Sequence, residues 1–123
     1  AIFSAIRTML SYCDFDISMI ERVYVAGGIG SGINMRNAIR IGMFPAIPVE
    51  MYHYIGNSSL TGSYLMLLST EAEKKTYELA ANMTYMELST VPTYMDEFVG
   101  ACFIPHTDTG MFPDVMNDLQ NRK

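Results

Sequence analysis

Four glycines within six residues give this sequence its clearest chemical signal. Residues 23–42 read VYVAGGIGSGINMRNAIRIG, in which an apolar stretch runs directly into Gly27, Gly28, Gly30 and Gly32. A helical pattern follows, and the order of strand, tight turn and helix is how open α/β sheets hold a phosphate or nucleotide. Because every glycine costs backbone entropy, four are more than an ordinary turn requires. The segment is therefore the first candidate for a binding site.

The two best-known glycine motifs for nucleotides do not fit this segment. Gly28 and Gly30 match the start of G-x-G-x-x-G, but Ile33 occupies the third glycine position. Glu50 lies about 20 residues further on, where an acid would bind the ribose, but two prolines interrupt the connection. A P-loop needs a lysine after its last glycine, and the first lysine is Lys74. The ligand stays open, and a purely structural turn is the alternative.

The cysteines and histidines form no recognisable catalytic or metal-binding pattern. Cys13 and Cys102 are far apart and make no CxxC pair, and the chain has only two histidines, His53 and His106. We expect both cysteines to be buried free thiols and His53 to be a hydrogen-bonded core residue. For His106, close to Cys102 and Asp108, we expect a structural or capping role, because nothing places this thiol as a nucleophile.

Composition limits the class of protein. The 123 residues suit one domain with a real core, and half of them are hydrophobic. A net charge of −5 argues against nucleic-acid binding. No apolar run approaches the roughly 20 residues of a membrane span, and residues 1–10 have no signal-peptide pattern, so we expect no membrane association and a cytoplasmic protein. The chain starts inside a helical pattern without Met, which we interpret as a piece of a longer protein.

Hydrophobic periodicity predicts alternating helices and strands. The expected strands are 22–26, 51–55 and 84–88, and the expected helices are 2–12, 35–41, 59–69, 70–82 and 93–103. This alternation predicts an α/β fold, with a small, mainly parallel sheet and flanking helices. Asn34 should cap the second helix and Gly42 close it.

The helices 59–69 and 70–82 are expected to carry apolar faces. Thr70 and Glu73 fit a capping box at the start of the second of them. We expect the inward residues to be Leu60, Tyr64, Leu67 and Leu68 in the first helix and Ala72, Leu79, Ala80 and Met83 around the second.

Three stretches of the sequence resemble the reductive activators of corrinoid proteins. They read ERVYVAGGIGSGINMRNAIRIGMFP, YIGNSSLTGSYLMLLS and MTYMELSTVPTYMDEFVGACFIPHTD, and they follow one another in the order found in that family. These activators are ATP-dependent metalloproteins of the acetate and sugar kinase, heat-shock chaperone and actin superfamily. The resemblance implies that residues 1–104 form a ribonuclease-H-like C-terminal lobe. Residues 105–123 are polar and rich in turn-forming residues, so we expect them to form an extended tail or edge segment.

The same resemblance implies where a nucleotide would bind. In the superfamily two similar lobes clasp ATP, and the strand–glycine turn of the second lobe approaches the adenine and ribose. A side chain at Gly27 or Gly28 would then occupy the space of the nucleotide. By this match the nucleotide-binding residues would be Gly27, Gly28, Gly30, Ser31 and Asn34, with Gly56 and Asn57 contributing to the packing or the cleft.

The activity implied for the parent protein is ATP-dependent reduction of cob(II)alamin to cob(I) in a corrinoid partner, expected in a methyl-transferring anaerobe. The phosphate motifs, the magnesium-binding acids and the iron–sulfur domain would lie upstream. This piece would therefore hold half an ATP site and no catalytic residue, and we expect it to be inactive alone.

Two other interpretations of the sequence stay open. The chain would also suit a lobe of a small-molecule kinase on the same fold, or a non-catalytic interaction module in which the glycine turn is only structural. Apolar surface left by missing lobe contacts would favour a homodimer.

Overall fold

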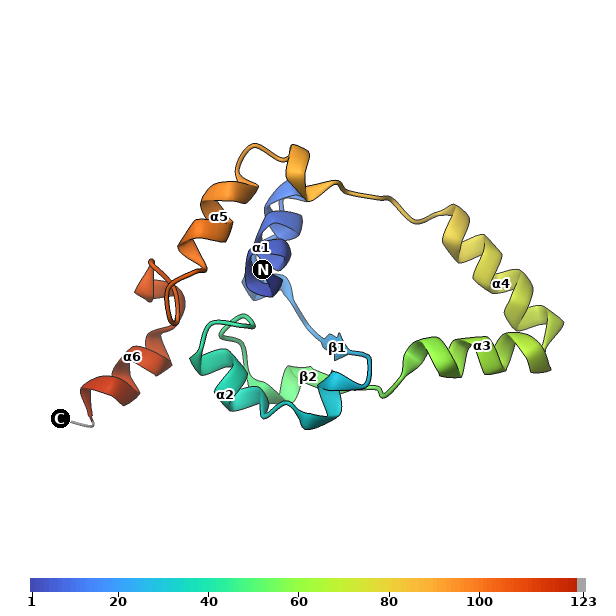
Figure 1. Ribbon diagram of the computed structural model, residues 1–123, viewed down its shortest axis with the longest axis horizontal. Helices are drawn as coiled ribbons and strands as arrows, with labels where there is room; N and C mark the ends of the chain where they lie inside the picture. The colour runs from blue at the N-terminus through green and yellow to red at the C-terminus, as the bar shows by residue number, and fades with distance from the viewer. Residues whose placement is uncertain (122–123) are drawn as a thin grey trace.

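The computed structural model describes residues 1–121, in which six α-helices surround and extend from a two-stranded sheet (Figure 1). The helices are α1 (Ile2–Tyr12), α2 (Met35–Arg40), α3 (Ser58–Leu68), α4 (Thr70–Ala81), α5 (Tyr94–Gly100) and α6 (Pro113–Gln120), and the strands are β1 (Val23–Val25) and β2 (Tyr52–Tyr54). The helix and strand types expected up to residue 82 are confirmed, with boundaries shifted by a few residues.

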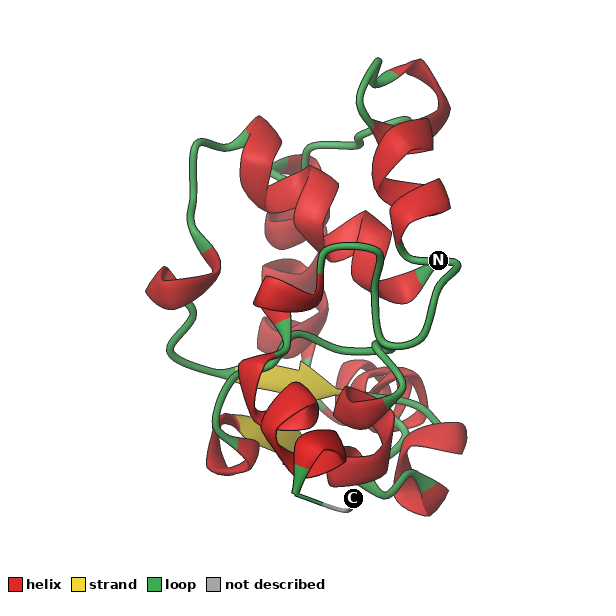
Figure 2. Ribbon diagram, turned by 90° about the vertical axis from the view of Figure 1, so that its left-hand side faces the viewer, coloured by secondary structure: helices red, strands yellow, loops and turns green. Residues whose placement is uncertain are grey.

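The two strands pair in parallel, as the sequence predicted. Val23 lies opposite Tyr52 and Val25 opposite Tyr54, and Figure 2 shows both strands side by side. A parallel pair needs a crossover, and α2 lies within the connection from β1 to β2. This places the carboxyl ends of both strands at one edge of the sheet.

The predicted third strand at 84–88 is wrong. Residues 83–87 link α4 to a 3₁₀ turn, Leu88–Thr90, and no strand forms beside them within residues 1–121. A strand is stable only when its backbone groups find a partner, and the sheet formed by β1 and β2 lies elsewhere.

The core lies where α1, α2 and the C-terminal segment meet. Its buried hydrophobic residues are Phe3, Ala38, Ile39, Phe44, Phe112 and Val115. The ring centroids of Phe3 and Phe112 are 5.4 Å apart, which joins the two ends of the chain. An ion pair between Arg7 and Glu97, at 3.3 Å, also ties α1 to α5. The packed part of the molecule therefore includes residues beyond 104, because Phe112 and Val115 belong to its core.

Residues 105–121 do not form the extended tail that was expected. Phe112 is fully buried, Val115 is buried, and α6 follows directly with Pro113 in its first turn. Proline is well tolerated there because its missing N–H would be unpaired anyway. The segment is therefore structured by burying its two apolar side chains. Residues 122–123 of the predicted tail lie outside the described residues.

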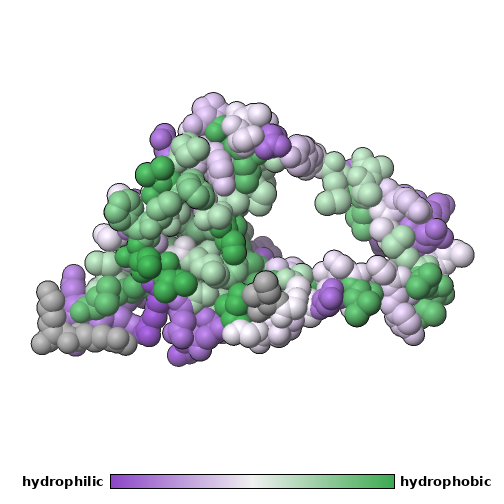
Figure 3. All heavy atoms as spheres, in the orientation of Figure 1, coloured by the Kyte–Doolittle hydropathy of each residue, from purple (hydrophilic) through white to green (hydrophobic). Residues whose placement is uncertain are grey.

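The hairpin of α3 and α4 projects from this body (Figures 1 and 3). Neither helix has a buried residue, so the expected inward faces are wrong for this chain: Leu67 is 85% exposed and Met83 79% exposed. The predicted cap at Thr70 is also wrong. The Ala72 N–H donates to Ser69 Oγ at 3.2 Å, so α4 begins one residue earlier than the capping box indicated.

None of the helices formed by residues 1–121 combines the length and the apolar character that a bilayer crossing needs.

Candidate functional site

The candidate site is built from two turns at the carboxyl ends of β1 and β2. After β1, Gly27 has φ +102°, a backbone conformation that favours glycine. Its N–H donates to the carbonyl of Gly56 at 2.8 Å, and Gly56 itself has φ +73° in the turn after β2. The two turns are therefore held together by backbone contact, at the edge where open α/β sheets bind ligands.

The space beside Gly27 and Gly28 is open. A Cβ atom built on either residue would have no heavy atom within 4 Å outside its immediate chain neighbours. Gly28 begins a 3₁₀ turn, Ile29–Gly32, with φ −64°, so its own conformation does not require glycine. A ligand can approach the backbone closely where no side chain fills the space beside it. Gly27 and Gly28 leave such a space.

Gly30 has a different role from its neighbours. A Cβ atom there would lie 2.7 Å from Cε2 of Tyr54 and 3.1 Å from Cγ1 of Val25. Its lack of a side chain lets the tyrosine ring close over the turn. Gly30 thus shapes the site by packing and does not face the open space.

The side chains of the two polar residues predicted for the site each form a hydrogen bond to a nearby residue. Ser31 Oγ donates to the Gly28 carbonyl at 2.9 Å. Asn34 Oδ1 accepts from the Asn37 N–H at 3.1 Å, which confirms it as the cap of α2. All five predicted residues therefore lie within residues 27–34. The Ser31 side chain stabilises the turn itself, and the Asn34 side chain stabilises the start of α2.

Tyr54 is the residue of this site that the sequence reasoning missed. Its hydroxyl donates to the Gly27 carbonyl at 2.9 Å while its ring covers Gly30. The signal was its position: Tyr54 ends β2 two residues before Gly56, beside the end of β1 in a parallel pair.

The second turn starts α3. Asn57 Oδ1 accepts from the Leu60 N–H at 3.1 Å, so Asn57 caps that helix. With the Gly27–Gly56 hydrogen bond, this places Gly56 and Asn57 directly beside the glycine turn. Gly56 therefore contacts the glycine turn directly, and Asn57 follows it in the chain.

The other reactive side chains belong to other segments of the chain. Cys13 and Cys102 are exposed, so the expectation of buried thiols is wrong, and so is a core position for His53, which is exposed on β2. His106 has the expected structural role: it is buried, and its Nδ1 accepts from the Asp108 N–H at 3.0 Å. Among residues 1–121 no three His, Cys, Asp or Glu side chains gather as metal ligands would.

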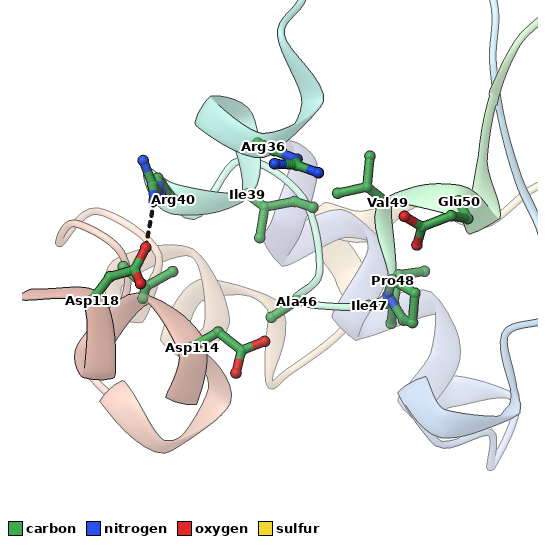
Figure 4. A pocket seen from close by; sticks show the side chains of 11 residues that line it. Arg36, Ile39, Arg40, Ala46, Ile47, Pro48, Val49, Glu50, Asp114 and Asp118 are labelled. Carbon is green, nitrogen blue, oxygen red and sulfur yellow. Dashed lines mark hydrogen bonds and ion pairs between the residues drawn. The ribbon is translucent and has the colours of Figure 1, made fainter.

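A cavity of about 450 Å³ lies between α2, residues 46–50 and α6 (Figure 4). Arg40 forms an ion pair with Asp118 at its rim, and Arg36 and Glu50 also line it. None of the predicted glycines does. The cavity mixes charges of both signs without converging on one point, so the paired turns remain the better candidate.

Tyr52 ties β2 to the loop that precedes it. Its hydroxyl donates to the Pro45 carbonyl at 2.7 Å, and burial raises the pKa of Tyr52 to about 12. The neutral Tyr52 side chain therefore helps to hold the start of β2 in place. Because Tyr54 ends the same strand, this contact also helps to position Tyr54.

Comparison with known proteins places this geometry in a family. Residues 1–116 match the family described as the C-terminal domain of RACo, the ASKHA domain. The chain belongs to this family. A solved structure titled reductive activator for corrinoid, iron-sulfur protein superposes with a TM-score of 0.87 and 49% sequence identity, covering 93% of this chain and 18% of its own. The corrinoid activation enzyme RamQ of Eubacterium limosum is 33% identical over 82 residues, which are 67% of this chain and 14% of that protein.

Membership in the ASKHA family implies nucleotide binding, and the structural match shows an ASKHA-type domain fold. The chain spans less than a fifth of the length of either relative. The resemblance of the sequence to this family is thus confirmed.

Proposed function

We propose that this chain is the nucleotide-binding C-terminal part of an ATP-dependent reductive activator, which returns cob(II)alamin of a corrinoid methyl-transfer protein to cob(I). The observation that carries the proposal is the pair of joined turns, with open space beside Gly27 and Gly28. Family membership and the names of the two relatives support the corrinoid part of the proposal.

The residues fit an adenine nucleotide in a defined way. Gly27 and Gly28 would let the backbone lie against the adenosine, and Tyr54 and Gly30 would hold the turn in shape behind them. Ser31 would act by stabilising the turn and Asn34 by fixing the start of α2, because both side chains are already hydrogen bonded there. ATP would supply the free energy of its hydrolysis. The residues that bind its phosphates and magnesium would be contributed by the parent protein outside this chain.

ATP would act on the corrinoid partner through conformation. If the closed, ATP-bound activator binds the corrinoid protein more tightly than the open form, ATP and partner affinities are linked by the same free energy. The electron would reach cobalt from an iron–sulfur cluster elsewhere in the parent protein, so this chain would hold no catalytic residue.

The test is reduction of cob(II)alamin by the full-length protein with its corrinoid partner and a low-potential donor, followed by visible absorbance. We expect cob(I) to accumulate with ATP and not without it. Equal cob(I) formation with and without ATP would refute the proposal. ATP-dependent phosphorylation of a small molecule, with no cob(I), would favour the kinase interpretation.

A further inference from the structure

α2 and α6 carry matching charges on the two sides of the cavity in Figure 4. Arg36 and Arg40 are four residues apart on α2, and Asp114 and Asp118 are four residues apart on α6. Residues four apart in a helix lie about one turn from each other on the same face. Two arginines one turn apart on α2 therefore oppose two aspartates with the same spacing on α6.

One of these two charge pairs is closed and the other is open. Arg40 and Asp118 form an ion pair at the rim of the cavity, whereas Arg36 and Asp114 form none within residues 1–121. Figure 4 shows Arg36 and Asp114 on opposite walls of the cavity, displaced in the same direction from the closed pair. The two helices are thus joined at Arg40 and Asp118 and stand apart at Arg36 and Asp114.

Apolar side chains line the cavity between the charged residues. They belong to Ile39, Ala46, Ile47, Pro48, Val49 and Val115. Folded proteins pack closely and keep few spaces of this size, because side chains that border a space lose contacts. Movement of the open ends of α2 and α6 toward each other would bring this apolar lining together and pair Arg36 with Asp114.

The free energy difference between the open and the closed pair is expected to be small. Arg36 and Asp114 are both exposed, and an exposed ion pair contributes little because solvent screens its charges. Burial of the apolar lining favours closure, whereas ordering of the two long side chains opposes it. A ligand that interacts differently with the two arrangements can therefore shift the equilibrium between them.

The open end of α2 is the end next to the glycine turn. Asn34 caps α2 through the hydrogen bond that its Oδ1 accepts from the Asn37 N–H at 3.1 Å. Arg36 comes two residues after Asn34, and Gly32 ends the 3₁₀ turn two residues before it. Arg40, in the closed pair, lies one helical turn further away. A shift of the open end therefore moves the helix start that directly follows the glycine turn.

We propose that α6 is a strap that closes on α2 when the glycine turn binds a nucleotide, by formation of the Arg36–Asp114 ion pair. This rests on the proposed function, because it takes ATP as the ligand of the turn. ATP against residues 27–28 fixes the start of α2, which favours closure. By linkage, closure raises the affinity for ATP by the same factor. Glu50 also lines the cavity and is the competing partner for Arg36.

The first test is hydrogen exchange of the full-length protein, read at the amides of α6 with and without ATP. We expect ATP to slow exchange in α6 of the natural protein and to have a much smaller effect in Asp114→Asn. Equal slowing in both proteins would show general stabilisation by the ligand and overturn the strap. If ATP binds by calorimetry but leaves exchange in α6 unchanged, the strap is refuted and the proposed function stands. A natural protein that does not bind ATP would refute both.

ATP affinities of matched variants of the full-length protein give an independent measurement. Asp114→Asn and Arg36→Gln should each weaken ATP binding roughly twofold to fivefold, which is the range for one exposed ion pair. The double variant should be no weaker than either single variant, because both remove the same contact. Glu50→Gln removes a charge from the same cavity and should leave the affinity unchanged. Unchanged affinity in Asp114→Asn, additive losses in the double variant, or an equal loss in Glu50→Gln would each overturn the Arg36–Asp114 pairing.

Discussion

At the scale of single residues, the glycines of the turn divide into two groups. Gly27 and Gly28 border open space, whereas Gly30 makes room for the ring of Tyr54. The sequence showed all of them as equal members of one motif, because a pattern of letters carries no information on which neighbour each Cα faces. Tyr54 could not be assigned for the same reason: its partner, Gly27, is 27 residues away.

Loss of the Tyr54 hydroxyl should loosen the turn without removing the packing of its ring. Tyr54→Phe in the full-length protein breaks the hydrogen bond to the Gly27 carbonyl, worth about 1 kcal/mol. If this contact positions the turn for ATP, affinity should fall roughly fivefold. Calorimetric titration measures it, and Tyr24→Phe, on the neighbouring strand with an exposed ring, is the control. Unchanged ATP affinity in Tyr54→Phe would remove the positioning role.

Tyr52 makes stability depend on alkaline pH. Its pKa is raised from 10.0 to about 12, because burial disfavours the phenolate. The stabilisation by neutral Tyr52 is thus complete below pH 10 and is lost as pH rises through about 12. Tyr52→Phe should be less stable than the natural protein below pH 10, and the gap should close toward pH 12. Urea unfolding at a series of pH values tests this, and a gap that stays constant with pH would contradict it.

At the scale of elements, prediction succeeded where the signal was local. The cap at Asn34 and the glycine that closes α2 act within a few residues, and both were read from the sequence. The prediction of a strand at 84–88 was wrong because a strand needs a neighbouring strand to pair with, and the sequence pattern does not show whether one is present. The prediction of an extended tail from residue 105 was wrong because burial of Phe112 depends on contact with Phe3 in α1, which is far away in the chain.

The boundary between α3 and α4 offers a direct test of an element-level assignment. Ser69→Ala removes the side chain that accepts from the Ala72 N–H and should lower the free energy of unfolding by about 1 kcal/mol. Thr70→Ala, at the position that the capping box suggested, should have a much smaller effect because Thr70 is already inside α4. Denaturant unfolding of both variants in the full-length protein decides. A larger loss from Thr70→Ala would restore the original assignment.

At the scale of the whole molecule, the chain combines a packed body with an apolar arm. The body brings the two ends of the chain together around Phe3 and Phe112, and the arm leaves α3 without cover. Half of the residues are hydrophobic, but the sequence did not indicate which helices would be exposed, because exposure depends on how the helices are arranged in space. Homodimer formation by the separate chain stays a prediction, and sedimentation velocity over a range of concentrations tests it.

The central claim is that the glycine turn binds the adenosine part of ATP. Gly28 is the best probe, because its φ of −64° and the open space around it should let the fold accept valine. Gly32, which also borders open space, provides the matched control.

Calorimetric titration of the full-length protein with ATP, with NAD as the reference ligand, is the measurement that decides. We expect ATP and not NAD to bind the natural protein, Gly28→Val to lose ATP binding while remaining folded by circular dichroism, and Gly32→Val to retain it. Equal ATP affinity in the natural protein and in folded Gly28→Val would show that the nucleotide does not lie against this turn.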